Sequence, residues 1–363
     1  MPPILRLFSA LALLLVLSGC VAFHSLPARD YTEPPPPGVV RIVFDENGDP
    51  WPLDADPAAL ALLPADLDKQ RHFGLAKGLA KARQPYDREA ILAEAARRIA
   101  PQGRVVVLIK GFNNSFGSFR GKFAATRQWL GEQGAVPEQR YVEVYWDALH
   151  RAGGKVPYPV GLFPRARGNA ERMAQCGLRD LLARFRQGTE VSIVGHSLGG
   201  AAALDAVTEP AKGWAAMRCS GGRKPPPVPA NLSDVRIAAF APAVGGGQLG
   251  IGREPLDPAR FTALSRLYVA WNPRDPAVTK HGKGLNLPDT LGGDTRLGGN
   301  RDFIARTTAA FGKGATSTLF QSLEFSQPSH ELATYLADRD RAACVLWAAK
   351  VLPDKPDGCA LER

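Results

Sequence analysis

Short apolar runs alternate with helix-forming stretches through most of the chain, a pattern typical of a parallel sheet with crossover helices. One run, residues 105–109, is wholly apolar, as expected of a strand covered on both faces. We expect strands at residues 39–44 (a candidate edge strand), 104–110, 140–146, 190–194, 235–240, 266–271 and 318–325. We expect helices at residues 87–100, 116–131, 171–187, 201–207 and 330–352, the last being one long C-terminal helix that follows Pro328.

Two stretches interrupt this alternation and are long for simple connections. Residues 149–168 carry Tyr158, Leu162 and Phe163 among glycines and prolines, and residues 282–300 are rich in glycine. They are candidate lid or pocket loops, or plain surface loops, and both interpretations stay open.

The N-terminus differs from the rest of the chain. Arg6 is followed by a leucine-rich segment, residues 7–17, that is too short to span a bilayer and is typical of a signal peptide. The segment ends L-S-G-C at Cys20, which resembles the lipobox of bacterial lipoproteins; an ordinary signal peptide with a chance cysteine is the alternative. The resemblance implies cleavage before Cys20 and acylation of that residue. Because Val21 rather than Asp follows, it also implies anchoring in the outer membrane, facing the periplasm.

Three parts follow from these observations. Residues 1–19 are a lipoprotein signal peptide, and residues 20–38 are a lipidated tether whose prolines at 34–37 keep it extended and away from the body. Residues 39–363 are long enough for one large α/β domain. Loss of the signal peptide removes Arg6 and lowers the formal net charge from +10 to +9. This charge suits anionic lipid or an anionic substrate, or belongs to a plain solvated surface, and no cluster of basic and aromatic residues indicates nucleic acid.

Four further cysteines remain, an even number for an oxidising compartment. Two disulfides with three possible pairings are expected, or else buried free thiols. A Cys344–Cys359 bond would pin the C-terminal tail to the last helix, and a Cys176–Cys219 bond would link regions flanking residue 197. The cysteines lack metal-site spacing, so we expect no metal and no cofactor.

The strand at 190–194 runs directly into residues 195–199, which read G-H-S-L-G and precede a helix-forming stretch. The match to G-x-S-x-G in a strand–turn–helix context predicts a nucleophile elbow with Ser197 at its apex. Glycines at 195 and 199 suit the tight turn, and a helix N-terminus favours negative charge beside the serine. The alternative is a structural turn with an inert serine.

A serine hydroxyl needs a base within hydrogen-bond reach. In the topology that goes with this elbow, the acid and then the histidine follow the serine. His330 follows the last expected strand and is our candidate base. His281 lies six residues after the best acid candidate, which leaves no room for the intervening helix and strand. His196, inside the elbow, is expected to pack or to orient the turn.

Asp275 is the candidate acid, because it follows the strand at 266–271 and is flanked by prolines. Asp294 in the glycine-rich loop is second, and Asp257 is less favoured. An aspartate before proline is also common in plain turns.

Two backbone N–H groups are needed to stabilise an oxyanion. Leu198, directly after the nucleophile, is expected to supply one. Phe112, in the loop after an early strand, is expected to supply the other, with Asn113 as the alternative.

With these residues assembled, the chain resembles the α/β-hydrolase superfamily over residues 103–345. Within it, the chain is similar to a bacterial family of unknown function that combines G-[FY]-N-x-S-F, here residues 111–116, with a strand ending near Trp, here Trp146, and G-H-S-[LM]-G. The elbow, Asp275 and His330 also resemble the class-3 (fungal-type) lipases. The resemblance implies an α/β-hydrolase fold, a mostly parallel sheet with helices on both faces. It also implies a serine hydrolase of esterase/lipase type.

One position departs from the family pattern, since Lys110 stands where a histidine usually precedes the oxyanion loop. The lysine could hold the same carbonyls, bring positive charge near the oxyanion, or accompany a loosened site.

Two other functions remain open: an acyltransferase with the same triad, and a non-catalytic envelope lipoprotein that binds through this scaffold. The side chains of Phe112, Phe116, Leu162 and Phe163 would suit an acyl chain or belong to the core. The expected partners are the membrane and an ester substrate, for which the membrane anchor favours a lipidic ester.

Overall fold

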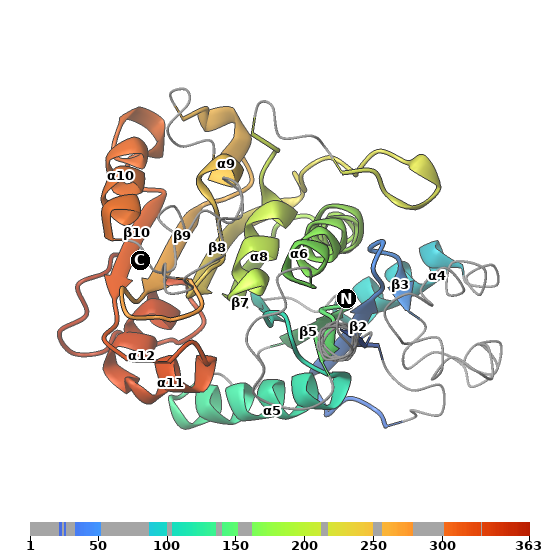
Figure 1. Ribbon diagram of the computed structural model, residues 1–363, viewed down its shortest axis with the longest axis horizontal. Helices are drawn as coiled ribbons and strands as arrows, with labels where there is room; N and C mark the ends of the chain where they lie inside the picture. The colour runs from blue at the N-terminus through green and yellow to red at the C-terminus, as the bar shows by residue number, and fades with distance from the viewer. Residues whose placement is uncertain are drawn as a thin grey trace, which may run out of the picture.

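A central sheet of eight strands organises the structure, a computed structural model (Figure 1). The strand order is β10-β9-β8-β7-β4-β5-β2-β3, and every neighbouring pair is parallel except β2 and β3. A separate two-stranded sheet pairs β1 with β6. The strands are β1 (Ala22–Phe23), β2 (Val39–Phe44), β3 (Pro50–Trp51), β4 (Arg104–Ile109), β5 (Arg140–Trp146), β6 (His150–Arg151), β7 (Thr189–His196), β8 (Leu232–Phe240), β9 (Arg266–Trp271) and β10 (Phe320–Glu324).

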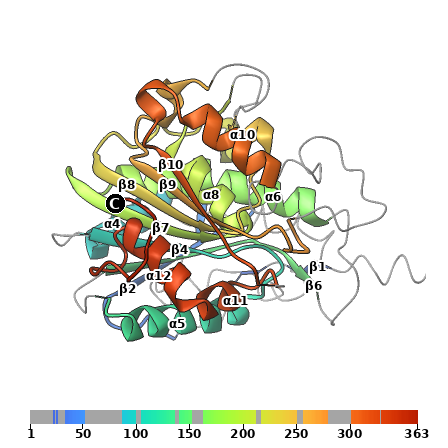
Figure 2. The same cartoon turned by 90° about the vertical axis from the view of Figure 1, so that its left-hand side faces the viewer.

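Helices cover both faces of this sheet, so the chain has an α/β fold. Figure 2 shows α5, α11 and α12 on one face and α6, α8 and α10 on the other. The helices are α4 (Arg88–Ile99), α5 (Phe116–Glu132), α6 (Leu162–Arg172), the π-helical η1 (Met173–Leu178), α7 (Arg179–Ala183), α8 (Leu198–Val207), α9 (Gly246–Leu249), α10 (Arg301–Phe311), α11 (Leu332–Ala337) and α12 (Arg339–Ala348). Short 3-10 turns are η2 (Ser220–Gly222), η3 (Pro258–Phe261) and η4 (Gly314–Thr316). Among the described helices, none has the length and apolar character needed to cross a bilayer.

The structure describes residues 22–23, 25–26, 33–51, 87–99, 104–135, 140–151, 162–211, 217–249, 256–278, 301–327 and 329–363. Several predictions lie outside these residues: the signal peptide, acylation of Cys20, the loop at 282–300, and the candidates Tyr158, His281 and Asp294.

Most expected strands are confirmed, because the central strands are apolar on both faces and the sheet buries them. Val105 through Ile109 in β4 are at most 1% exposed. The prediction that β2 forms an edge was wrong. β2 lies between β5 and the short antiparallel β3, which pairs with Val43 and Phe44.

Two helix predictions need correction. The helix expected at 171–187 begins at Leu162 and ends at Ala183, with η1 in its middle, so residues 162–168 are not loop. Pro164 is compatible with this start because the first turn of a helix needs no N–H donor there. The long C-terminal helix is two helices, α11 and α12, separated at Asp338, whose ψ of 78° is not helical.

The tether prediction also needs correction within the described residues. Ser25 and Leu26 are buried, at 0% and 3% exposure. Glu33 is tied to the body through its carbonyl, which accepts a hydrogen bond from Arg41, and through an ion pair with Arg120. Parts of the 20–38 segment therefore pack on the body instead of extending away from it.

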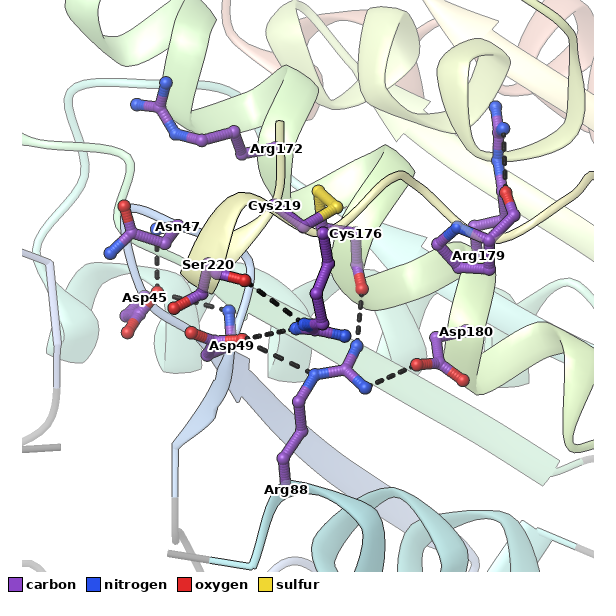
Figure 3. The surroundings of a disulfide bond; sticks show 12 residues. Asp45, Asn47, Asp49, Arg88, Arg172, Cys176, Arg179, Asp180, Cys219 and Ser220 are labelled. Atoms are coloured by element: carbon purple, nitrogen blue, oxygen red, sulfur yellow. Dashed lines mark hydrogen bonds and ion pairs between the residues drawn. A yellow bond between two sulfur atoms is a disulfide. The ribbon is translucent and has the colours of Figure 1, made fainter. Parts of the chain in front are cut away.

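Two disulfides are present, Cys176–Cys219 and Cys344–Cys359, which settles the pairing left open by the sequence. The first links η1 to the segment before η2. Around it, the Arg88 guanidinium donates to the Cys176 carbonyl and pairs with Asp180 (Figure 3). The bond is thus set in a polar cluster that joins α4, η1 and α7.

Candidate active site

Ser197 occupies the sharp turn between β7 and α8. Its backbone has φ 55° and ψ −124°, a left-handed conformation that costs about 1–3 kcal/mol in a residue with a side chain. The turn is held on both sides: the Ser197 N–H donates to the Phe240 carbonyl, and its own carbonyl accepts from Ala243. This strand–turn–helix geometry is the one that the G-x-S-x-G motif predicts.

Glycines around this turn permit close backbone contact. A Cβ at Gly195 would lie 2.7 Å from the Gly199 carbonyl oxygen, and one at Gly199 would lie 2.4 Å from that of Ile109. A Cβ at Gly111 would lie 2.7 Å from the Cβ of Ser197. The loop after β4 therefore packs directly on the serine.

Asp275 and His330 are in contact although 55 residues separate them. The His330 Nδ1 lies 2.8 Å and 3.0 Å from the two carboxylate oxygens of Asp275. The carboxylate accepts this hydrogen bond, so Nδ1 carries the proton and Nε2 has a lone pair available to take one. Asp275 is fully buried, and the His330 side chain is 20% exposed. This contact is the one expected between the acid and the base of a Ser–His–Asp arrangement.

Further donors fix the carboxylate of Asp275. The Tyr335 hydroxyl donates to Oδ2 at 3.0 Å, and the Ala277 N–H donates to Oδ1 at 2.9 Å. Burial and the adjacent Asp275 charge raise the pKa of Tyr335, so its hydroxyl stays protonated as a donor. Asn272 joins this loop to the histidine loop, because its side-chain amide donates to the Gln327 carbonyl.

His196 connects the elbow to the histidine loop. Its Nε2 lies 2.6 Å from the His330 carbonyl oxygen, and the two rings are 4.9 Å apart. A carbonyl only accepts, so Nε2 of His196 carries the hydrogen. Burial, reinforced by the neighbouring His330 and Lys110, lowers the pKa of His196 well below its ordinary value. The imidazole is therefore a neutral donor that positions the His330 backbone.

Ser197 lies near this pair, because the adjacent His196 contacts the His330 carbonyl. Within the described part of the chain, Ser197 Oγ forms no hydrogen bond with His330. Catalytic contacts of this kind often close only when substrate binds.

The two predicted oxyanion donors lie in the expected elements. Leu198 opens α8, and its N–H has no backbone acceptor among the described residues. In the loop after β4, the Asn114 side chain donates to the carbonyls of Gly111 and Phe112 and thereby shapes the turn. The alternative donor, Asn113, is less suitable because its N–H faces the Ala148 carbonyl at 3.4 Å.

The ammonium group of Lys110 does not hold the carbonyls of the loop after β4. Its Nζ donates to Thr126 Oγ1 on α5 at 2.8 Å and lies over the Phe123 ring. Burial, followed by repulsion from Lys122, lowers its pKa to about 7. The lysine packs α5 against β4, while Asn114 holds the loop carbonyls.

Of the other candidate residues, some lie at the site and others have structural roles elsewhere. The Phe112 and Phe163 rings meet edge to face at 5.4 Å, so α6 contributes an apolar side chain beside the loop that follows β4. Phe116 is buried against Tyr145 and belongs to the core. Asp257 is exposed and caps η3 through the Ala259 N–H, a structural role.

Sequence reasoning missed three polar residues that support the site. Asn114 lies inside the G-F-N-N-S-F motif, so its position signalled a loop function. Asn272 and Tyr335 carry no local signal, because their partners are distant in sequence.

No protein-family model, curated protein or solved structure matches this chain.

Proposed function

We propose that the protein is a serine hydrolase with an α/β-hydrolase fold that cleaves carboxylic esters of the esterase/lipase type. The observation that carries this proposal is the contact of His330 with the buried Asp275, next to the strained Ser197 turn. Plain structural turns do not require an aspartate, a histidine and a left-handed serine at one sheet edge. We further propose that the mature chain starts at Cys20, is acylated there, and remains on the outer membrane.

In the proposed reaction, His330 Nε2 accepts the Ser197 hydroxyl proton as Oγ attacks the ester carbonyl carbon. Asp275 stabilises the imidazolium and keeps Nδ1 protonated. The N–H groups of Leu198 and Phe112 stabilise the oxyanion. The tetrahedral intermediate collapses, the alcohol leaves with the proton from His330, and an acyl-enzyme remains. Water, activated by His330, then releases the acid and restores Ser197.

Labelling with a fluorophosphonate, which reacts only with an activated serine, tests this proposal. We expect the wild type to be labelled, and the Ser197→Ala and His330→Ala variants to be unlabelled. Ser192→Ala is the matched control, because Ser192 lies on β7, the strand that leads into Ser197, and its hydroxyl donates to the Ala349 carbonyl. Failure of the folded wild type to react, with detergent present, would favour the binding-scaffold alternative.

A labelled serine would then be assayed for turnover on p-nitrophenyl esters of increasing chain length. Loss of Ser197 or His330 should lower kcat by about 10⁴-fold or more, as in other triads. Added alcohol acceptors that yield new esters instead of free acid would identify the acyltransferase alternative.

A further inference from the structure

The segment that follows Cys20 is docked on the candidate active site. Ala22 and Phe23 of β1 pair with Arg151 and His150 of β6, the next strand after β5 (Figure 2). Buried Ser25 continues the attachment beyond this short ladder.

Ser25 makes two hydrogen bonds to loops at the carboxyl edge of the sheet. Its N–H donates to Asp147 Oδ1 at 2.9 Å, and its hydroxyl donates to the Asn114 carbonyl. Asn114 is the residue that holds Gly111 and Phe112 of the oxyanion loop. The N-terminal segment and the oxyanion loop are therefore one connected structure.

This docking limits how far the site can be from Cys20. Cys20 precedes Ala22 by two residues, which span at most about 7 Å when fully extended. An acyl group on Cys20 enters the bilayer, so Ala22 and the loops bound to Ser25 are held at the lipid surface. A long flexible tether would impose no such restriction.

We propose that the carboxyl edge of the sheet, around β1, β6 and the loop at 111–115, rests on the lipid bilayer that holds Cys20. This inference rests on acylation of Cys20 and, for its catalytic consequence, on the proposed hydrolase function. The half-buried Phe112 and Phe163 lie at this edge, and Arg274 beside Asp275 is exposed there. Apolar and cationic side chains suit a bilayer with anionic headgroups.

Helix α5 offers two matched positions for testing the orientation. Gly117 near its start and Gly131 near its end are both exposed, and an added Cβ would meet nothing within 4 Å at either. Fourteen residues separate them, which is about 21 Å along the helix. Gly117 lies beside the oxyanion loop, and Gly131 lies toward the opposite edge of the sheet.

The experiment places a fluorophore on Gly117→Cys or on Gly131→Cys in acylated, full-length mature protein. Each variant is bound to vesicles of phosphatidylcholine with a minority of phosphatidylglycerol and of nitroxide-labelled lipid. We expect quenching at position 117 to be several-fold stronger than at position 131. Equal quenching, stronger quenching at 131, or a mass showing no acyl group on Cys20 would each overturn the proposal.

A second variant tests whether the short connection sets the orientation. A flexible insert of about 20 Gly and Ser residues between Cys20 and Val21 leaves β1 intact. We expect it to reduce the difference in quenching and to lower hydrolysis of a vesicle-resident ester about tenfold, with unchanged hydrolysis of a soluble short-chain ester. If the insert changes neither the quenching difference nor the hydrolysis of the vesicle-resident ester, the proposal is overturned.

The two proposals fail in different ways. If the wild type cleaves neither ester but the quenching differs as expected, the hydrolase function is wrong and the membrane orientation stands. If esters are cleaved but both positions are quenched alike, the hydrolase function stands and the orientation is wrong.

Discussion

At the scale of single residues, the phenol of Tyr335 matters because it shares the buried carboxylate of Asp275 with His330. A carboxylate that accepts several hydrogen bonds holds its negative charge more easily and binds an added proton less strongly. The interaction between Asp275 and His330 therefore depends on Tyr335, although Tyr335 takes no part in the proposed reaction.

Tyr335→Phe should lower kcat/KM about tenfold. Without the phenol, the Asp275 carboxylate loses one of its hydrogen-bond donors and holds the His330 imidazole less firmly in place. We also expect a loss of about 1 kcal/mol in the free energy of unfolding. The measurement is kcat/KM for a soluble ester. Tyr268→Phe, whose hydroxyl donates to the Glu362 carbonyl, should leave kcat/KM unchanged.

His196 should behave as a positioning residue. His196→Leu removes the donor to the His330 carbonyl and should lower kcat about tenfold or more with little change in KM, since ground-state binding is not its task. His196→Gln keeps an N–H donor of similar reach and should recover part of the loss. Steady-state kinetics of both variants test this, and equal kcat values for the two would contradict it.

At the scale of elements, Lys110 joins β4 to α5 by placing an ammonium group in the interior. Its pKa falls from 10.5 to about 7 on folding, so between these values the unfolded chain binds more protons than the folded one. Stability from this group therefore rises with pH across that window, by up to about 1.4 kcal/mol per pH unit.

Lys110→Met should remove this dependence. Urea unfolding between pH 7 and pH 9.5 should show wild-type stability increasing relative to the variant as the pH rises. Lys224→Met, at an exposed position, should retain the wild-type slope. A variant slope that matches the wild type would show that the buried ammonium is not the cause.

The elements also show what the sequence could predict. Strands β5 and β9 have the expected bounds, because apolar runs between polar ends report burial on both faces. The start of α6 was missed because Pro164 and Gly168 indicated a loop, whereas the helix accepts both. The contact between Asp275 and His330 follows from strand order, but the partners of Tyr335 and Asn114 depend on packing that no local pattern records. The catalytic roles stay predictions.

At the scale of the whole molecule, the two disulfides close loops of different length. Cys176 and Cys219 are 43 residues apart, and Cys344 and Cys359 are 15 apart. A cross-link that closes a longer loop removes more conformational freedom from the unfolded chain. The expected contributions are about 4 kcal/mol for the first and about 3 kcal/mol for the second.

Replacing both cysteines of a pair with serine should show this order. The Cys176→Ser/Cys219→Ser variant should lose more stability in urea than the Cys344→Ser/Cys359→Ser variant. The reverse order would show that packing around the bonds, including the Arg88 cluster, outweighs loop length.

The strand order also has a consequence for a chain that emerges from its N-terminus first. β1 cannot pair until residues 150–151 have crossed, because they form its partner strand. Ser197 has no base until His330, which comes much later in the chain, has crossed as well. Asp275 likewise cannot contact His330 until the 55 residues that separate them in the sequence have crossed. Under the proposed function, the polypeptide is catalytically silent while it crosses a membrane. It becomes a hydrolase only when nearly all of it has reached the far side.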